Sequence, residues 1–325
     1  MILITGASGF LGQHLVQRLV AENVPVRALY HNNKPSEELR QLPNVHWVQC
    51  DLLDVFAVEQ AFKDIQEVYH CAAKVSFDAA DKYLIQQINA ESTAHVVNTA
   101  LEANIRKLVF VSSIATLGRG NLEQALTELD FWEESKNNSA YARSKYLSEM
   151  EVWRGMAEGL NAVIVNPAVI LGAGNWEQGS ARLMKVVDNE FPFYTEGVNG
   201  WVDVKDVVNA MLLLMKSDIC EERFILCEGN HSYKEIFTLM AHALGKKPPY
   251  LKAPKWTTGL LWRWNVLRKL FTGKSATLTK ETTRTAQVKC YYNNEKLLKA
   301  FPEFSYTPIE KTIEEMAIMY KSDRQ

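Results

Sequence analysis

Short apolar runs alternate with longer amphipathic stretches through the first half of the chain. The runs are rich in valine and isoleucine and lie at residues 2–4, 24–30, 45–48, 67–70, 107–112 and 162–166. Alternation of this kind predicts βαβ units and a parallel sheet. Because the runs are almost continuously apolar, we expect helices on both faces of the sheet. The pattern therefore predicts a doubly wound α/β fold.

The pattern changes after Pro167. Glycine and proline recur between residues 172 and 200, before a helical pattern at 206–215 and a short apolar run at 223–226. We expect residues 1–170 to form the main domain, with returns to it at about 201–216 and 223–227. Residues 171–200 and 228–325 are expected to form a smaller carboxyl-terminal subdomain that binds the substrate.

A glycine-rich turn joins the first apolar run to the first helical pattern. It reads Gly6-Ala7-Ser8-Gly9-Phe10-Leu11-Gly12. Strand, glycine turn and helix in this order predict a Rossmann-type dinucleotide site, with the phosphates at the helix N-terminus. Gly6 would permit the tight turn, Gly9 would let the backbone approach the pyrophosphate, and Gly12 would allow close helix packing. The alternative is an ordinary βα turn, which does not explain three glycines at a spacing of three.

The residues after the second apolar run bear on the choice of cofactor. NAD sites commonly place an acidic residue here to accept the ribose hydroxyls, and none is present. His31 and Lys34, with Arg27, could instead bind the 2′-phosphate of NADP, although a solvated loop is the alternative reading of Lys34. We expect NADP to be preferred over NAD. After the third run, Asp51 and Leu52 suit adenine, unless Asp51 caps the following helix.

Two further segments carry candidate chemistry. Tyr141 and Lys145 are four residues apart in a helical pattern, which puts them on one face. A phenol has a pKa of about 10, and a neighbouring ammonium favours its ionised form and makes it a better acid-base group. Ser112 and Ser113 end an apolar run at the carboxyl edge of the sheet, where ligands bind. We expect Ser113 to hold a substrate oxygen and Ser112 to bond to backbone.

Composition narrows the classes of function. The 325 residues are 47% hydrophobic and carry a net charge of −2, so they can bury a large core and offer no basic field for nucleic acid. The five cysteines are scattered without metal-ligand spacing, so we expect reduced thiols and no metal. No apolar run is long enough for a membrane-spanning helix, and no signal peptide pattern opens the chain. We expect a cytoplasmic protein without stable membrane insertion.

These motifs together resemble the extended short-chain dehydrogenase/reductase superfamily, which includes the NAD-dependent epimerases and dehydratases. The matching segments are Thr5-Gly-Ala-Ser-Gly-Phe-Leu-Gly12, Asp51-Leu52, His70-Cys-Ala-Ala73, Ser112-Ser113, Tyr141-Ala-Arg-Ser-Lys145 and Asn166-Pro-Ala-Val-Ile-Leu-Gly172. The resemblance implies that Ser113 and Tyr141 contact the reacting oxygen and that Lys145 binds the nicotinamide ribose. It also implies that Asn89 supports the active-site helix.

The resemblance implies further cofactor contacts. Ala72 and Ala73 would line the cofactor. The backbone from Pro167 through Val169 to Ile170 would bind the nicotinamide carboxamide. The segment Trp201 to Asp206 resembles the part of the family that returns the chain to the main domain.

Three local features narrow the reaction. Ser113 is not followed by the acidic pair of family dehydratases, and Asn199 with Gly200 stands where nucleotide-sugar enzymes usually carry an arginine. Residues 256–271 form an apolar helical stripe beside basic residues. That stripe and the later Leu278 to Lys296 region resemble the 3β-hydroxysteroid dehydrogenase and dihydroflavonol reductase branch. The stripe is either ordinary core, a wall of an apolar pocket or a membrane-surface contact.

These features predict an NADP-preferring reductase or dehydrogenase that moves hydride between the nicotinamide and a secondary alcohol or ketone on a hydrophobic small molecule. The runner-up is a nucleotide-sugar 4-epimerase, which uses the same triad. A non-catalytic cofactor-binding sensor is a third alternative, against which the intact triad argues. Helices at residues 89–102 and 141–158 are expected to pair in a homodimer, as family members of this architecture often do.

Overall fold

The computed structural model describes residues 1–76, 81–118, 124–135, 138–253 and 286–324. Its centre is a seven-stranded parallel sheet in the order β10-β6-β5-β4-β1-β2-β3. The strands are β1 (Ile2–Thr5), β2 (Val26–Tyr30), β3 (Val45–Gln49), β4 (Glu67–His70), β5 (Lys107–Val111), β6 (Ala162–Pro167) and β10 (Glu222–Leu226). The predicted doubly wound α/β fold is confirmed.

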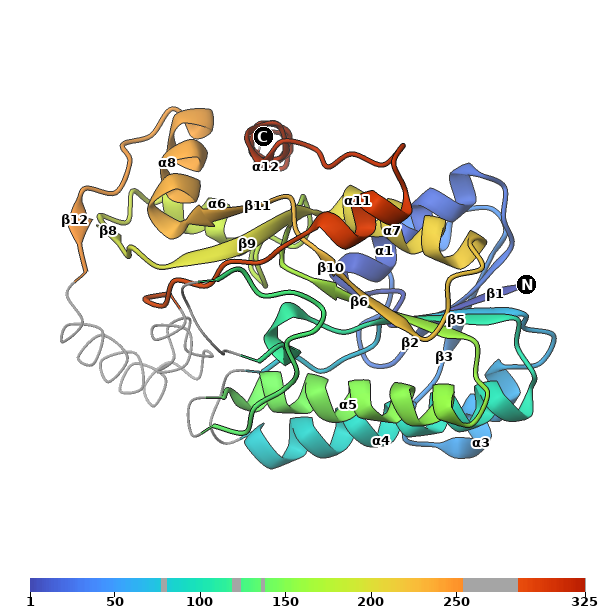
Figure 1. Cartoon of the computed structure of the whole chain (residues 1–325). Helices are drawn as coiled ribbons and strands as arrows, with labels where there is room; N and C mark the ends of the chain where they lie inside the picture. Colours follow the sequence, from blue (N-terminus) through green and yellow to red (C-terminus); the bar gives the residue numbers. More distant parts are fainter. Residues whose placement is uncertain (77–80, 119–123, 136–137, 254–285, 325) are drawn as a thin grey trace.

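Helices cover both faces of this sheet (Figure 1). On one face lie α1 (Phe10–Ala21), α7 (Val204–Lys216) and α11 (Glu295–Ala300); on the other lie α3 (Val55–Ala61), α4 (Lys82–Glu102) and α5 (Ala140–Ala157). The short α2 (Glu37–Arg40) follows β2. Alternate residues of one strand enter different cores: Val109 packs with the α1 and α7 side, whereas Leu108 and Phe110 pack with the α4 and α5 side. Two-sided burial explains the continuous apolar runs.

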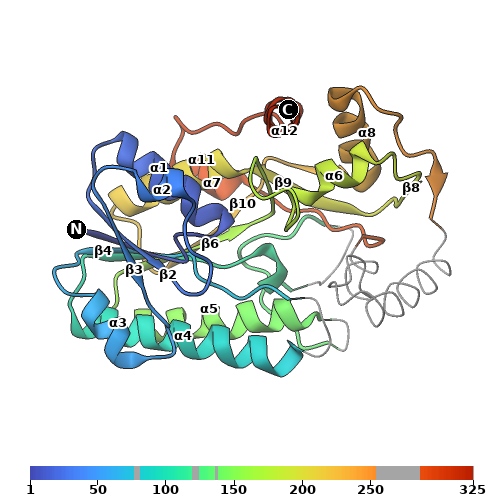
Figure 2. The same ribbon diagram turned by 180° about the vertical axis from the view of Figure 1, so that it is seen from behind.

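The second half of the chain adds two small sheets. A three-stranded sheet has the order β11-β9-β7 and a two-stranded one pairs β12 with β8. Their elements and helices are β7 (Val169–Leu171), α6 (Arg182–Asp188), β8 (Phe193–Tyr194), β9 (Val198–Asp203), β11 (Gly229–Ser232), α8 (Tyr233–Leu244), β12 (Leu251–Lys252) and α12 (Ile309–Ser322). Figure 2 shows α6 and α8 beside β9, far from α3. Together they enclose a third core.

The returns of the chain to the main sheet differ slightly from expectation. Residues 201–203 belong to β9 of the three-stranded sheet, and α7 then packs against α1 of the main layer. β10 does join the main sheet, beside β6. The division of the chain into two domains remains a prediction. The apolar stripe at 256–271 lies outside the described residues, as does the segment 278–285.

Candidate active site

The glycine turn between β1 and α1 is tight and closely packed. Gly6 has φ of +65°, a conformation that favours glycine. A side chain at Gly6 would also place its Cβ 2.7 Å from the Ala72 Cα. At Gly12 the Cβ would lie 2.2 Å from the Gly6 carbonyl oxygen. The backbone therefore requires glycine at both positions.

The N-terminus of α1 is open to an anion. Its N-cap residue is Gly9, no side chain caps it, and its first turn carries no acidic residue. The first N–H groups of a helix have no partner within the helix, and the helix dipole is positive there. Ser8 is half-buried and Leu11 is buried in the core below the turn. These residues fit the phosphates of a dinucleotide.

The loop after β7 is held against α1. The Phe10 ring packs on Gly174, where a Cβ would lie 2.8 Å from the ring. The His14 ring lies 5.5 Å from that of Phe10 in an edge-on contact, and its Nε2 is 2.9 Å from the Ala173 carbonyl oxygen. Pro167 is buried at the end of β6 and Val169 begins β7 half-buried, so both lead into this loop. The loop thus borders the glycine turn.

The ends of β2 and β3 are exposed. His31 Nε2 lies 3.6 Å from Asp51 Oδ2, and about half of each side chain is accessible. Lys34 is also exposed. Arg27 is placed elsewhere, because its guanidinium donates to the carbonyl oxygens of Ala61 and Lys63 at 2.9 and 2.6 Å. The suggestion that Arg27 meets a 2′-phosphate is therefore wrong: it is an early residue of β2 and faces the end of α3.

Asp51 does not cap the helix that follows it. The cap of α3 is Asp54, whose Oδ1 accepts from the Ala57 N–H at 3.2 Å. Asp51 Oδ1 instead accepts from the Leu53 N–H at 3.0 Å. Leu52 packs on the α3 and α4 side of the core, and its carbonyl oxygen is 2.9 Å from His95 Nδ1. The Asp51 carboxylate is thus about half exposed, between the Leu53 N–H and the His31 ring.

The catalytic candidates meet where β5 ends. Ser113 has extended backbone and begins a short 3₁₀ helix, Ile114–Thr116. Its side chain is hydrogen-bonded to Tyr141, which lies in the first turn of α5. Lys145 is one turn further, only 3% exposed, and its Nζ donates to the Val111 carbonyl oxygen at 2.7 Å. The same ammonium lies 4.6 Å from the centre of the Phe110 ring.

Burial governs the acid-base character of these groups. It raises the pKa of Tyr141, although the hydrogen bond with Ser113 lowers it. Burial also lowers the pKa of Lys145 to about 8, against the opposing effect of Glu149. The expected fall in the pKa of Tyr141 beside an ammonium is therefore wrong for this structure, because burial is the larger cause and raises it. Tyr141 therefore carries its proton at neutral pH.

Asn89 joins two parts of the site. Its Oδ1 accepts from the Lys74 N–H at 2.8 Å, and its Nδ2 donates to the Lys74 carbonyl oxygen and to Ser144 Oγ, both at 3.0 Å. Ser144 belongs to α5, and Lys74 follows Ala72 and Ala73 in the loop after β4. A single amide therefore fixes this loop against the helix that carries Tyr141.

A buried histidine to which the sequence analysis gave no role supports the same loop. The Ala72 N–H donates to Thr5 Oγ1 at 3.2 Å, and Thr5 Oγ1 lies 2.6 Å from His70 Nδ1. On the other side of the ring, Nε2 lies 3.0 Å from Thr93 Oγ1, which donates to the Asn89 carbonyl oxygen at 2.8 Å. These directions assign the proton to Nε2. Burial lowers the pKa of His70 to about 3, so the ring is neutral.

Behind Lys145 lies a buried carboxylate that the sequence analysis also missed. Glu149 pairs with Arg223 at 3.1 Å, and their side chains are 3% and 8% exposed. Ser112 Oγ donates to Glu149 Oε2 at 2.5 Å, so Ser112 bonds to a carboxylate and not to backbone as expected. Tyr141, Lys145 and Glu149 follow one another at a spacing of four, which is the signal in the sequence that places Glu149 on the catalytic face.

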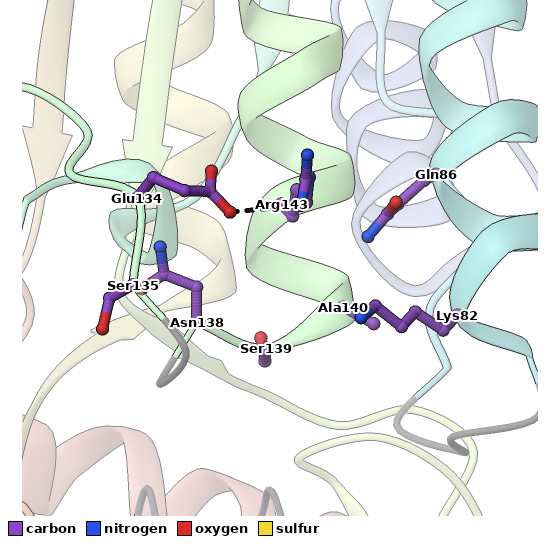
Figure 3. Close-up of a pocket in the computed structure, with 8 residues that line it drawn as sticks. All are labelled: Lys82, Gln86, Glu134, Ser135, Asn138, Ser139, Ala140 and Arg143. Atoms are coloured by element: carbon purple, nitrogen blue, oxygen red, sulfur yellow. Dashed lines mark hydrogen bonds and ion pairs between the residues drawn. The ribbon is translucent and has the colours of Figure 1, made fainter.

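A cavity of about 300 Å³ opens beside the start of α5, and its lining includes Ala140, the residue before Tyr141 (Figure 3). Its lining includes the ion pair of Arg143 with Glu134, at 3.1 Å. Tyr141 and Ser113 do not line it, so we do not assign it to the reaction. Among the described residues no group of histidine, cysteine and acidic side chains is arranged to hold a metal. The described helices include none suited by length and hydropathy to cross a membrane.

Comparison with known proteins identifies the family. Residues 2–226 match the "NAD dependent epimerase/dehydratase family". The chain is 27% identical over 305 residues to a "Putative dihydroflavonol 4-reductase" of Synechocystis, covering 91% of this chain and 88% of the relative. It is also 27% identical to "Cinnamoyl-CoA reductase 2" of Medicago truncatula, over 76% of this chain and 77% of that one.

Solved structures share the fold. A UDP-glucose 4-epimerase of Thermotoga maritima with UDP-glucose superposes with a TM-score of 0.80 at 18% identity, covering 100% of this chain and 99% of that one. The Bordetella bronchiseptica enzyme WbmH, in complex with NAD+, gives a TM-score of 0.76 at 20% identity, over 98% and 97% of the two chains. The family match spans well over half of the sequence. The chain therefore belongs to the NAD dependent epimerase/dehydratase family and is an NAD(P)-dependent enzyme of the extended short-chain dehydrogenase/reductase superfamily.

Proposed function

We propose that this enzyme transfers hydride between NADP(H) and a secondary alcohol or ketone on a hydrophobic small molecule. When bound, the nicotinamide supplies or accepts the hydride. The observation that carries the proposal is the hydrogen bond between Ser113 and Tyr141, with the Lys145 ammonium one helical turn away. This arrangement can hold a substrate oxygen between two hydroxyl groups while a proton passes to it.

The proposed roles follow from the surroundings of each group. Because burial raises the pKa of Tyr141, its phenol is protonated and suited to donate a proton to the oxygen of a ketone. Ser113 orients that oxygen through its own hydroxyl. Lys145 donates one hydrogen to the Val111 carbonyl oxygen and has two further N–H donors, which suits the hydroxyls of the nicotinamide ribose.

For the cofactor we propose contacts along the carboxyl edge of the sheet. The pyrophosphate would lie on the N–H groups at the start of α1, beside Gly9, Phe10 and Leu11. Ala72 and Ala73 would line the middle of the cofactor, and the backbone from Pro167 to Val169 would bind the carboxamide. Asp51 and Leu52 would border the adenine. His31 and Lys34, both exposed, favour NADP because no carboxylate follows β2 directly.

Several observations favour an apolar substrate. Two reductases among the relatives are named for substrates that carry aromatic rings, dihydroflavonol and cinnamoyl-CoA, and are similar over three quarters of the chain or more. Asn199 stands where nucleotide-sugar enzymes usually carry an arginine, and its amide Nδ2 lies 3.5 Å from the Tyr233 hydroxyl. A neutral amide beside a phenol offers no cation to a diphosphate. The apolar segment 256–271 supports the same substrate class from the sequence alone.

A substrate panel tests the proposal. Oxidation of NADPH is followed with hydrophobic ketones, including aromatic and polycyclic ones, and with UDP-glucose and UDP-galactose as the contrasting substrates. We expect saturable turnover with members of the first set and neither binding nor reaction with the second. Interconversion of the two UDP-sugars would instead establish the 4-epimerase, which the shared fold of the Thermotoga maritima enzyme makes the second candidate.

We also propose that the enzyme is a cytoplasmic homodimer that pairs α4 and α5 across a two-fold axis. The two helices pack closely on each other and lie on the outside of the sheet (Figure 1). Tyr83 and Leu84 of α4 and Met150 of α5 are exposed there, which suits burial in a subunit contact. Light scattering at micromolar concentration should give twice the 36.9 kDa mass of the chain. A monomer would contradict this pairing.

A further inference from the structure

Glu149 is surrounded by groups that carry or touch Ser113. Its Oε2 accepts hydrogen bonds from Ser112 Oγ at 2.5 Å, from Thr116 Oγ1 at 2.8 Å and from Asn166 Nδ2 at 3.0 Å. Ser112 precedes Ser113, and Thr116 ends the 3₁₀ helix that Ser113 begins. The carboxylate therefore binds one residue before Ser113 and one residue after it.

One of the same groups also binds Ser113 itself, and a second lies beside it. Asn166 Nδ2 donates to the Ser113 carbonyl oxygen at 3.1 Å, and Thr116 Oγ1 lies 2.9 Å from that oxygen. Both side chains are buried, at 0% and 1% exposure. An amide has two hydrogens and a hydroxyl has one, so their orientation depends on which acceptors surround them. Glu149 Oε2 is the charged acceptor among these, and charged acceptors form the stronger hydrogen bonds.

The other carboxylate oxygen holds Glu149 in place. Its Oε1 accepts from Arg223 at 3.1 Å and from the Trp153 indole at 3.3 Å. The guanidinium of Arg223 also donates to the carbonyl oxygens of Glu128 and Asp130, at 2.9 and 3.1 Å. Glu149 is thus fixed by β10 and by the 124–131 loop, while it belongs to the helix that carries Tyr141.

We propose that Glu149 is a positioning residue that holds the Ser113 segment and the Tyr141 helix in register. The inference rests on the proposed function, in which the hydroxyls of Ser113 and Tyr141 share one substrate oxygen. Glu149 touches neither that oxygen nor the cofactor. It acts through Ser112, Thr116 and Asn166, and it places the Ser113 hydroxyl where Tyr141 can reach it.

The test reads the Ser113–Tyr141 contact without turnover. The protein is labelled with [ζ-¹³C]tyrosine, and the Tyr141 signal among the twelve tyrosines is identified by its loss in Tyr141→Phe. Ser113→Ala then gives the Cζ shift that follows from losing the hydrogen bond. We expect Glu149→Gln to move the Tyr141 signal in the same direction. Glu151→Gln, which alters a partly exposed carboxylate on the same helix, serves as the control and should leave it in place.

Turnover gives the second measurement. With a ketone substrate, Glu149→Gln should lower kcat by about 10²-fold, the usual effect of misplacing a reacting group by an ångström, with little change in cofactor binding. An unmoved Tyr141 signal in folded Glu149→Gln overturns the inference even when activity falls. If no substrate is found, the proposed function fails. The shift of the Tyr141 Cζ signal still decides the role of Glu149, because it needs no turnover.

A milder variant, Thr116→Val, tests the inference if Glu149→Gln does not fold. Thr116→Val keeps the shape of the side chain and the ion pair with Arg223, and removes only one hydroxyl from the cluster. We expect a smaller displacement of the Tyr141 signal in the direction given by Ser113→Ala. An unchanged signal in Thr116→Val would overturn the inference as well.

Discussion

The two ends of the proposed cofactor site differ in how firmly their side chains are held. At the end of β5, Ser113 and Lys145 lie among buried partners, and the Glu149–Arg223 pair beneath them is almost inaccessible to solvent. At the ends of β2 and β3, His31 and Lys34 are exposed, and His31 has only a 3.6 Å contact with Asp51. The candidate catalytic groups are thus held by buried contacts, whereas the groups proposed to select the cofactor are exposed.

This contrast predicts the largest effect for Tyr141. Tyr141→Phe removes the proton donor and should lower turnover by about 10²- to 10⁴-fold, the usual range for a general acid. The phenol is only one part of a packed site, so the melting temperature and NADPH affinity should change little. The melting temperature is measured by thermal shift, and the NADPH affinity by nicotinamide fluorescence. Turnover that survives the substitution would remove Tyr141 from the mechanism.

The next largest effect is expected on the free energy of unfolding, from the buried pair of Glu149 and Arg223. Arg223→Met leaves the Glu149 carboxylate buried without its cation, which costs about 3–5 kcal/mol of the free energy of unfolding. As control, Arg154→Met removes a cation from the partly exposed pairs with Glu151 and Glu158, where the cost is about 0–1 kcal/mol. Urea unfolding of the two variants compares them. Equal losses would mean that the buried pair contributes no more than a surface one.

His70 should make the folded protein sensitive to acid. Its pKa in the folded protein is lowered to about 3 by burial, against an ordinary value of 6.5 for histidine. The unfolded chain therefore binds a proton that the folded chain does not, so the stability from the neutral ring is complete above pH 6.5 and is lost as the pH falls towards 3. The loss is at most about 1.4 kcal/mol per pH unit. In His70→Gln the free energy of unfolding should vary less steeply over this range; an unchanged slope would contradict the assignment.

The smallest effect is expected at the exposed end. Wild-type protein should be stabilised more by NADPH than by NADH, and Lys34→Glu should reduce that preference by about 1.4- to fivefold, since an exposed ion pair contributes about 0.2–1 kcal/mol. Lys63→Glu is the matched control, because Lys63 is an exposed lysine that follows the end of α3. Dissociation constants of both cofactors are measured by fluorescence titration. Tighter binding of NADH by the wild type would reverse the cofactor assignment.

The sequence was sufficient for the central sheet because two-sided burial leaves a local trace. The two ends of each of its seven strands lie within two residues of the ends of a predicted apolar run. For β4 the strand and the run, 67–70, are the same. Local spacing also located Tyr141 and Lys145, since positions four apart on a helix share a face. Asp51 failed as a cap because Asp54, three residues later, is better placed for the first turn.

The buried partners could not be predicted in the same way. Glu149 and Arg223 are 74 residues apart, and Thr93 meets His70 across 23 residues. The direction in which a strand side chain points depends on the neighbouring helices. The sequence therefore does not show that the Arg27 side chain turns to the end of α3 and not to the cofactor. Such contacts arise from the packing of distant elements, and no periodicity in the sequence records them.

The order in which the sheet is assembled has a consequence for synthesis on the ribosome. β10 lies beside β6, but the chain first builds β7 and β9 of the three-stranded sheet before it supplies β10. A nascent chain that ends before Arg223 holds Glu149 without its cation, and burying that lone charge is unfavourable. We therefore expect the segment around Ser113 and Tyr141 to reach its final packing only after residue 223 has left the exit tunnel.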